Sequence, residues 1–210
     1  MFNNRNYFLR SGDLAVSIAG HDKHALDQAF LLRHKIFAER LGWVEKNNNF
    51  KDEDEYDKGS IIFVASKKNH DKILGTFRIT PHKEVFMLEK AFENLKQNVE
   101  LIKNQQTVEL SRLVVDPDIK DGVLRKKLPL MLYRALYVWC SKNSVRYIYM
   151  VSTKRYLRRL SEKLRIPIHK LSNSELTADG EEYYTGMIDL KEARKSMGFF
   201  KFMIFRYMRL

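Results

Sequence analysis

The spacing of hydrophobic positions along the chain alternates between two residues and three to four residues, which predicts strands interleaved with helices. Apolar side chains at helical spacing predict a helix over 23–40, and two apolar runs at 60–67 and 73–80 predict a hairpin. Further strands are predicted at 13–19, 107–115, 145–152, 166–171 and 181–190, and further helices at 88–102, 128–142 and 154–164. An antiparallel front half followed by a βαβ-like second half indicates an α+β fold built on one mixed sheet.

The composition favours one ordered domain spanning 1–210. Of the 210 residues 44% are hydrophobic, and only 9 are Gly and 4 are Pro, which excludes a disordered or linker-rich chain. No apolar run approaches the ~18 residues that cross a bilayer, and the N-terminal segment lacks a secretory signal, so we expect a cytoplasmic protein without a transmembrane segment. The aromatic and basic tail at 198–210 is expected to cover the core.

The cysteine and histidine residues offer little chemistry. A single cysteine, Cys140, excludes an internal disulfide and a four-cysteine zinc site, and its apolar helix predicts a buried, inert thiol. The 6 His residues have no metal-ligand spacing, so no metal is expected. His34 and His169 are interpreted as surface or edge residues.

The charge balance points to an acidic partner. Lys and Arg number 38 against 26 Asp and Glu, a formal net charge of +12. Nucleic acid, anionic lipid and an acidic protein or cofactor all fit this excess, and composition does not choose between them.

Four charged features occupy unexpected positions. Arg33 lies within the apolar stripe of the predicted helix 23–40, and Arg78 and Arg112 lie inside predicted strands. The acidic run 52–57 interrupts an otherwise basic chain. Each feature alone fits a solvated surface, because long cations often lie at the edge of a helix stripe and acidic runs often form exposed loops.

Together these charges could form a network inside a cleft. Buried charges persist only when they are paired and hydrogen-bonded, and the carboxylates of Asp54, Asp57 and Glu109 could pair with the two strand arginines. Glu109 and Arg112 are three positions apart, so regular alternation would place them on opposite faces of a strand. Both can reach one site only if the strand contains a β-bulge.

The charged positions fall into an ordered series of short motifs. These are Leu32-Arg33, Ile36-Phe37, Arg40-Leu41-Gly42-Trp43, Glu53-Asp54-Glu55-Tyr56-Asp57, Gly75-Thr76-Phe77-Arg78, Phe92 and Val108-Glu109-Leu110-Ser111-Arg112. Their order and spacing resemble the acyl-homoserine-lactone (autoinducer) synthases and the related N-acyl amino acid synthases, over roughly 13–172. The resemblance implies a GNAT-like acyltransferase fold, with one mixed, mostly antiparallel central sheet flanked by helices.

The resemblance also implies a reaction. In the autoinducer synthases an acyl carrier protein delivers a fatty acyl thioester on its phosphopantetheine arm. The amine of S-adenosylmethionine attacks this thioester, and lactonisation then expels methylthioadenosine. Both molecules are substrates, so no tightly bound cofactor is expected.

Site residues are carried over by position. The implied catalytic residues are Glu109, Arg112, Asp54 and Arg78, and the implied substrate-binding residues are Arg33, Phe37, Trp43, Asp57, Phe92 and Ser111. Glu109 would be the general base, because a protonated α-amine attacks only after a base removes a proton. The rings of Phe37 and Trp43 suit a sulfonium cation, and backbone N–H groups near 113–116 would stabilise the oxyanion.

Two basic segments are implied to dock the donor. Arg125, Lys126 and Lys127 lie where GNAT proteins handle pantetheine phosphates, and Lys154, Arg155, Arg158 and Arg159 follow in the predicted helix 154–164. Carrier proteins are acidic, so a basic face suits them. A solvated helix face is the alternative interpretation.

Several alternatives stay open. Ser111–Val115 and Tyr183–Gly186 look closer to the N-acyl amino acid synthases, whereas Phe37 and Leu41–Trp43 match the autoinducer group better. We therefore expect S-adenosylmethionine as the acceptor amine, with a free amino acid as second candidate, and acyl carrier protein or acyl-CoA as donor. A nucleic-acid-binding protein would instead have a continuous basic groove and no acidic cleft. An interaction module on a degenerate acyltransferase fold is a third class, which the retained charged positions disfavour.

Overall fold

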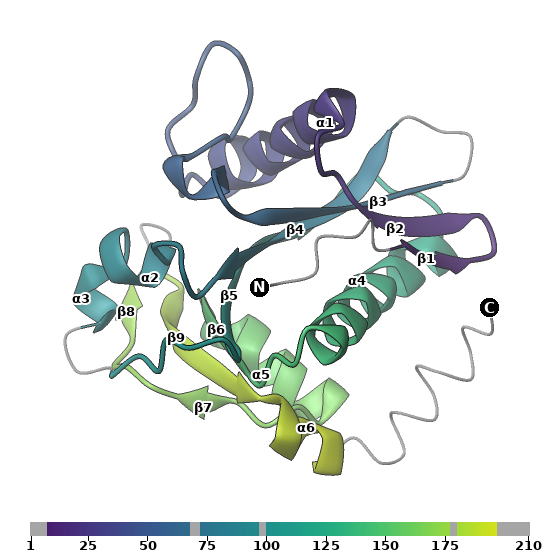
Figure 1. The fold of residues 1–210 in the computed structure, drawn as a ribbon. Helices are drawn as coiled ribbons and strands as arrows, with labels where there is room; N and C mark the ends of the chain where they lie inside the picture. The colour runs from purple at the N-terminus through teal and green to yellow at the C-terminus, as the bar shows by residue number, and fades with distance from the viewer. Residues whose placement is uncertain (1–7, 68–71, 97–99, 177–179, 197–210) are drawn as a thin grey trace.

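The computed structural model describes residues 8–67, 72–96, 100–176 and 180–196 of the chain (Figure 1). The predicted tail at 198–210 lies outside these residues. Within them, no helix combines the length and the apolar character that a membrane span requires.

A single mixed sheet organises the molecule, with strand order β1-β2-β3-β4-β5-β6-β9-β7 and with β8 paired to β9. Its strands are β1 (Phe8–Ser11), β2 (Leu14–Ile18), β3 (Ile61–Lys67), β4 (Ile73–Pro81), β5 (Thr107–Val115), β6 (Tyr147–Thr153), β7 (His169–Lys170), β8 (Glu175–Leu176) and β9 (Glu182–Asp189). All pairings are antiparallel except the parallel pair β5–β6. The predicted α+β plan on one mixed sheet is confirmed.

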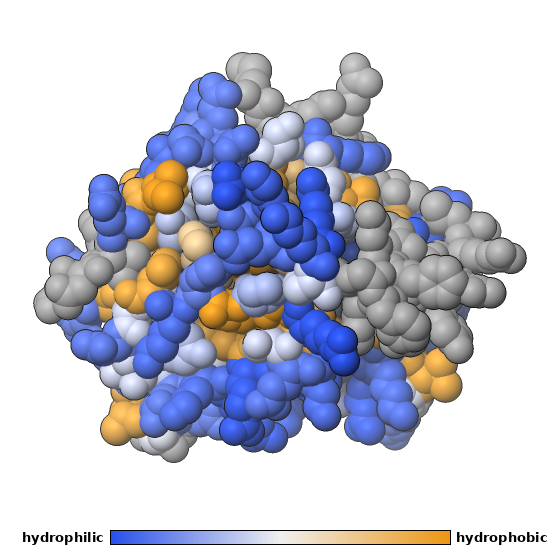
Figure 2. All heavy atoms as spheres, turned by 90° about the horizontal axis from the view of Figure 1, so that it is seen from below, coloured by the Kyte–Doolittle hydropathy of each residue, from blue (hydrophilic) through white to orange (hydrophobic). Residues whose placement is uncertain are grey.

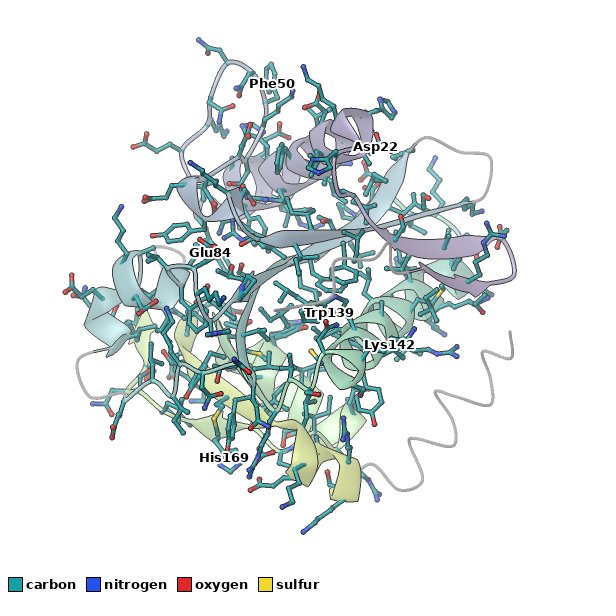
Figure 3. All side chains as sticks on the ribbon, in the orientation of Figure 1. Asp22, Phe50, Glu84, Trp139, Lys142 and His169 are labelled. Atoms are coloured by element: carbon teal, nitrogen blue, oxygen red, sulfur yellow. The ribbon has the colours of Figure 1, made fainter. Side chains whose placement is uncertain are left out.

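Helices cover both faces of this sheet (Figure 1). α1 (Lys23–His34) packs on one face of β3 and β4, and α4 (Gly122–Lys142) packs on the opposite face. Each helix has its own hydrophobic cluster, and Trp139 points from α4 into the larger one (Figure 3). The hydrophobic core therefore lies on both faces of the sheet, and the strand residue Arg78 lies on the face of α1, where it shares Asp57 with Arg33.

The start of α1 follows from its capping residue. Asp22 precedes the helix, and its carboxylate accepts a hydrogen bond from the Ala25 backbone N–H at 3.1 Å (Figure 3). The helix then widens into a π-helical segment, Lys35–Arg40, so the predicted helix at 23–40 is confirmed in extent.

The strands β5 and β6 pair only at their beginnings. Thr107 to Glu109 are in register with Tyr147 to Tyr149, and no later residues of the two strands pair. The crossover helix α4 joins them, as parallel strands require. Beyond residue 109 the strands diverge and leave one side of β5 free of strand partners.

Several predicted boundaries need correction. The predicted helix 88–102 is replaced by two short helices, α2 (Met87–Lys90) and α3 (Glu93–Lys96), because the chain turns at Ala91 and residues 100–106 are not helical. α4 begins at Gly122 rather than 128, because Asp121 caps it. α5 (Lys154–Leu164) agrees with its prediction, and β1, β8 and α6 (Leu190–Ser196) were not predicted.

The surface agrees with the composition. Seen from below, it is largely hydrophilic, with hydrophobic atoms visible near its centre (Figure 2).

Cys140 is fully buried, as predicted, and burial raises the pKa of its thiol. The prediction for His34 is wrong, since its ring is 1% exposed beneath Phe50, whereas His169 is exposed and pairs with Glu192 at 2.7 Å.

Candidate active site

Arg33 is buried and directed toward the acidic loop. Its Nη1 and Nη2 donate to the two carboxylate oxygens of Asp57 at 2.7 and 3.1 Å, and its Nε donates to Asp52 at 3.2 Å. Burial by itself would lower the pKa of this guanidinium, but the hydrogen bond to Asp57 raises it above its ordinary value. The arginine within the helix stripe therefore belongs to an internal charge network.

The two strand arginines complete that network. Arg78 is fully buried on β4, and it donates to Asp54 and, at 2.8 Å, to Asp57. Arg112 on β5 donates to Asp54 at 3.0 Å and lies 2.8 Å from a carboxylate oxygen of Asp52. Three arginines thus face three aspartates, so the cluster is electrically balanced. We call these six residues the charged cluster.

The acidic loop is fixed in a conformation that suits this pairing. A short 3-10 helix, Glu55–Asp57, begins after Asp54, whose carboxylate accepts from the Tyr56 backbone N–H at 3.0 Å. Burial by itself would raise the pKa of Asp57, but its hydrogen bonds with Arg33 lower it below its ordinary value. The Asp57 carboxylate therefore remains ionised at neutral pH.

A β-bulge brings Arg112 to the cluster. Thr76 is opposite Val114 and Arg78 is opposite Ser111, so β5 advances three residues while β4 advances two. Arg112 has a φ of 54°, a left-handed conformation that non-glycine residues rarely adopt. The bulge that the spacing of Glu109 and Arg112 required is confirmed.

Glu109 contacts Met87, as do the two strand arginines, Arg78 and Arg112. Its carboxylate accepts hydrogen bonds from the backbone N–H groups of Met87 and Leu88 at 2.8 and 2.9 Å, and Arg78 lies 2.8 Å from the Met87 sulfur. The side chain is 2% exposed, and burial raises its pKa to about 7 despite these hydrogen bonds. Glu109 can therefore accept a proton near neutral pH.

A pocket of about 500 Å³ opens beside the charged cluster. Four rings line it, from Trp43, Tyr56, Phe92 and Tyr183, and we call it the aromatic pocket. Asp54 and Arg112 line it as well, while Phe37 lies behind it, with its ring centre 6.0 Å from that of Trp43. Of the predicted substrate-binding residues, Trp43 and Phe92 line this pocket.

A groove of about 610 Å³ lies where β5 and β6 diverge. Its walls are residues 110–115 of β5 and 150–153 of β6, and Phe37 and Ser111 contribute to its lining. We call it the strand groove. It shares Trp43, Arg112 and residues 151–153 with the aromatic pocket, so the two spaces meet beside the bulge.

An apolar cavity of about 60 Å³ adjoins the strand groove. It is formed between the sheet and the helices α4, α5 and α6. Leu110, Met150 and Tyr156 line both the cavity and the strand groove. A narrow, apolar chain could pass from the groove into this cavity.

Only two of the predicted donor-docking residues line the strand groove. Arg155 and Arg159 line the strand groove, whereas Lys154 and Arg158 pair with Glu182 at 2.9 Å and Glu162 at 3.7 Å. The residues Arg125, Lys126 and Lys127 lie in the first turns of α4 and are not part of the groove lining, and Lys127 donates to the Ser11 carbonyl at 3.2 Å.

Sequence reasoning missed three residues of the site. Asp52 is 6% exposed and binds two arginines, and only its place in the acidic run could have suggested this role. Tyr56 and Tyr183 line the aromatic pocket, but they come from segments far apart in the sequence.

The cluster of carboxylates also contradicts the nucleic-acid alternative, which required that no acidic cleft exist.

Comparison with known proteins gives a consistent family. A family model described as autoinducer synthase matches residues 18–196. An acyl-homoserine-lactone synthase of Vibrio anguillarum is 27% identical over 171 residues, which cover 78% of this chain and 87% of the relative. Both solved structures below are less than 25% identical to this chain and show the fold alone.

The first of these structures is the AHL synthase LasI, with a TM-score of 0.76, 19% identity, and coverage of 92% of this chain and 96% of LasI. The second is BjaI, a CoA-dependent acyl-homoserine lactone synthase solved with SAM and isopentyl-CoA, with a TM-score of 0.74 and 21% identity. The match covers 88% of this chain and 83% of BjaI.

Proposed function

This chain belongs to the autoinducer synthase family, and we propose that it transfers a fatty acyl group from a phosphopantetheine thioester to the α-amine of S-adenosylmethionine. Lactonisation then yields an N-acyl-homoserine lactone and methylthioadenosine. The observation that carries the proposal is the junction of the aromatic pocket and the strand groove beside Arg112, with Glu109 buried next to it.

The aromatic pocket is proposed to hold the acceptor. Its volume of about 500 Å³ suits a nucleoside-containing molecule better than a small amino acid. A sulfonium cation is attracted to aromatic faces such as that of Trp43, which is 41% exposed on the rim. Asp54 offers a carboxylate for a cationic amine, and Arg112 a guanidinium for a carboxylate.

The strand groove is proposed to hold the pantetheine arm of the donor. Residues 110–115 of β5 have no pairing with β6, so backbone groups on that side can bind an extended ligand as a further strand would. The apolar cavity lined by Leu110 and Met150 would take the acyl tail, because burial of methylene groups is favourable. The acyl carbonyl then lies near the junction with the aromatic pocket.

The first step forms an amide. The amine nitrogen attacks the thioester carbonyl carbon, the C–N bond forms, and the C–S bond breaks. The departing pantetheine sulfur takes up the proton that the amine nitrogen loses, passed on by Glu109, and leaves as a thiol. Glu109 is proposed to receive the amine proton through an intervening water, because its carboxylate is buried behind Met87 and is not part of the pocket lining. Backbone N–H groups at 113–116 are proposed to stabilise the oxyanion.

The second step closes the lactone. A carboxylate oxygen of the acceptor attacks the carbon next to the sulfonium, the C–O bond forms, and the C–S bond breaks to release neutral methylthioadenosine. No acid or base is needed in this step, because the nucleophile is already an anion and the leaving group is neutral.

The charged cluster is proposed to hold Arg112 and Asp54 in place at the pocket wall. Each of these side chains has at least two charged partners, which restricts its rotamers. A rigid arrangement lowers the cost of ordering the site when substrate binds.

Product analysis tests this proposal. The purified protein is given one acyl carrier protein thioester and either S-adenosylmethionine or a mixture of free amino acids, and products are identified by mass spectrometry. We expect an N-acyl-homoserine lactone, which Glu109→Gln should form about 10²- to 10⁴-fold more slowly. Acylated amino acids as the main product would support the second acceptor candidate, and no acylated product would contradict both.

A further inference from the structure

The segment 100–106, between α3 and β5, is tied back onto the start of α2. Lys103 of this segment donates from Nζ to the Glu89 carboxylate at 2.6 Å and to the carbonyl of Glu84, which precedes α2, at 2.9 Å (Figure 3). Nζ also lies 4.3 Å from the centre of the Phe86 ring. The side chains of Lys103 and Glu89 are each 24% exposed, so solvent screens their attraction only in part. The proposed reaction steps use neither residue.

Glu89 in turn fixes the N-terminus of α2. The carboxylate oxygen that accepts from Lys103 also accepts from the Phe86 backbone N–H at 2.8 Å. α2 has only 4 residues, Met87–Lys90, and a helix that short is not stable from its own hydrogen bonds. Its position therefore depends on such contacts with side chains.

The same N-terminus also holds the carboxylate of Glu109. Three successive backbone N–H groups are divided between two acids. The first, that of Phe86, binds Glu89, whereas the next two bind Glu109 at 2.8 and 2.9 Å. The two carboxylates therefore lie close together, where like charges repel each other. A cation paired with Glu89 offsets this repulsion.

The charges around Glu109 come from several elements. Arg78 of β4 favours the ionised form of its carboxyl group, and Glu89 of α2 opposes it. Arg78 and Arg112 are already paired with the aspartates of the charged cluster. Within the described part of the chain, Lys103 is the one cation that forms an ion pair with Glu89.

Two further titratable groups lie near these side chains, and both are neutral near pH 7. Tyr149 of β6 is opposite Glu109, its hydroxyl accepts from the Ile102 backbone N–H at 3.0 Å, and burial raises its pKa. Burial and nearby lysines, Lys103 among them, lower the pKa of His82. The hydrogen bond to Tyr149 also attaches the segment 100–106 to a strand neighbour of Glu109.

We propose that Lys103 is a positioning residue for the proposed reaction. Through Glu89 it holds the N-terminus of α2 against the Glu109 carboxylate, and it offsets the negative charge of Glu89. This inference rests on the proposed function, because it assumes that Glu109 is the base. Lys103 is not part of the lining of the aromatic pocket or of the strand groove, so it acts on the reaction through Glu109 alone.

Loss of the Lys103 charge acts on Glu109 in one direction. The unpaired charge of Glu89 would raise the pKa of Glu109 further, and a looser N-terminus of α2 would weaken the hydrogen bonds that lower it. Because the ionised carboxylate is the base, kcat/KM would then rise at a higher pH than in the unaltered protein.

The pH profile of kcat/KM for S-adenosylmethionine tests this inference. Initial rates are measured from about pH 6.5 to 8.5 with one acyl donor in excess. The variants are Lys103→Gln, Lys103→Arg, Glu89→Gln and the double variant Lys103→Gln/Glu89→Gln. Comparison between variants removes the titration of the substrate amine, which is the same in all of them. Lys90→Gln is the matched control, because it removes a cation of α2 that pairs with Glu55 rather than with Glu89.

We expect Lys103→Gln to move the midpoint of the profile up by about 0.3 to 0.7 pH unit, the size expected for a partly exposed ion pair. At about pH 6.5 this shift lowers kcat/KM by about two- to fourfold, whereas at about pH 8.5 the change is less than about twofold. Lys103→Arg keeps the charge, so its profile and that of Lys90→Gln should match the unaltered protein.

The variants of Glu89 separate charge from structure. Glu89→Gln alone should lower the midpoint, because it removes the negative charge beside Glu109, and this result tests the inference even if Lys103→Gln does not fold. The double variant should return the midpoint close to that of the unaltered protein, since both charges are then absent.

Three results would overturn the inference. One is a fall in kcat/KM for Lys103→Gln that is equal at every pH, which would indicate a general loss of structure. Another is a shifted midpoint that persists in the double variant, which would mean that Glu89 does not carry the effect. The third is an equal shift in Lys90→Gln, which would indicate a general effect of surface charge. Failure of the proposed function is separable, because the unaltered protein would then make no lactone or would show a flat profile.

Discussion

Replacement of Glu109 by Gln separates the catalytic role of this residue from its effect on stability. The carboxyl group is 2% exposed and accepts hydrogen bonds from the backbone N–H groups of Met87 and Leu88. Gln has nearly the same shape and keeps one carbonyl acceptor, but it cannot ionise. Glu109→Gln therefore removes a buried negative charge without removing volume from the core.

The magnitude follows from the pKa of Glu109. Burial raises this pKa from 4.5 to about 7, so the folded protein holds the proton more tightly than the unfolded chain does. Stability from this group is present below pH 4.5 and falls as pH rises toward 7. The difference between 4.5 and about 7 corresponds to about 3.5 kcal/mol, at about 1.4 kcal/mol for each tenfold change in proton affinity. Relative to the unaltered protein, the variant should therefore gain stability as pH rises from about 5 to 8. This gain adds to a pH-independent loss, because the amide NH2 of Gln faces one of the two backbone N–H donors.

Urea denaturation at several pH values measures this effect. The quantity of interest is the difference in unfolding free energy between Glu109→Gln and the unaltered protein, because other titrating groups cancel in it. Glu53→Gln is the control, since Glu53 is exposed. We expect the difference to grow by about 2–3 kcal/mol from about pH 5 to pH 8 for Glu109 only. In the same preparations, kcat should fall by about 10²- to 10⁴-fold.

A pH-independent difference, or a variant that becomes less stable as pH rises, would refute this reasoning. The activity of the unaltered protein gives a second check. Because the ionised carboxylate is the base, kcat/KM should increase with pH through a value near 7. A flat profile between about pH 6 and 8 would contradict the assignment of Glu109 as base.

Three further predictions concern the cluster, the cavity and the thiol. Asp57→Asn removes a negative charge that pairs with the buried guanidinium groups of Arg33 and Arg78, so urea denaturation should show that the unfolding free energy falls by about 3–5 kcal/mol. A fall of less than about 1 kcal/mol would contradict a buried network. Ala193→Leu narrows the apolar cavity, so product analysis with a series of acyl donors should show a shift toward shorter chains, and an unchanged preference would place the acyl tail elsewhere. Cys140 is fully buried and burial raises the pKa of its thiol, so alkylating reagents should label it only after unfolding and should not reduce the activity of the folded protein. Inactivation of the folded protein by these reagents would indicate a reactive thiol.

Much of the fold could be predicted from periodicity. The strands β3, β4 and β5 and the helix α5 lie within one or two residues of their predicted bounds, because each has a continuous apolar pattern. The segment 88–102 failed for a physical reason. Its apolar residues Leu88 and Leu95, together with the preceding Phe86, form one buried cluster with Tyr149 of β6, and such tertiary packing overrides local helical spacing.

The site was predictable where a charge occupied an apolar position. Arg33, Arg78 and Arg112 are conspicuous because a buried charge requires partners, and the spacing of Glu109 and Arg112 required the bulge that the structure contains. Asp52 was not distinguishable from its acidic neighbours, since its burial depends on how the loop folds over α1. The residues that line the aromatic pocket come from segments far apart in the sequence. The order of the strands in the sheet brings these segments together, and local sequence patterns do not determine that order.

Acyl transfer and lactone closure are proposed to occur on one acceptor, S-adenosylmethionine. The most direct test is to count both products in the same reaction of purified protein with an acyl-phosphopantetheine donor. We predict that one methylthioadenosine is released for each N-acyl-homoserine lactone formed, and that Glu109→Gln slows the formation of both products by about 10²- to 10⁴-fold. Acylation of an amine without release of methylthioadenosine would contradict the account.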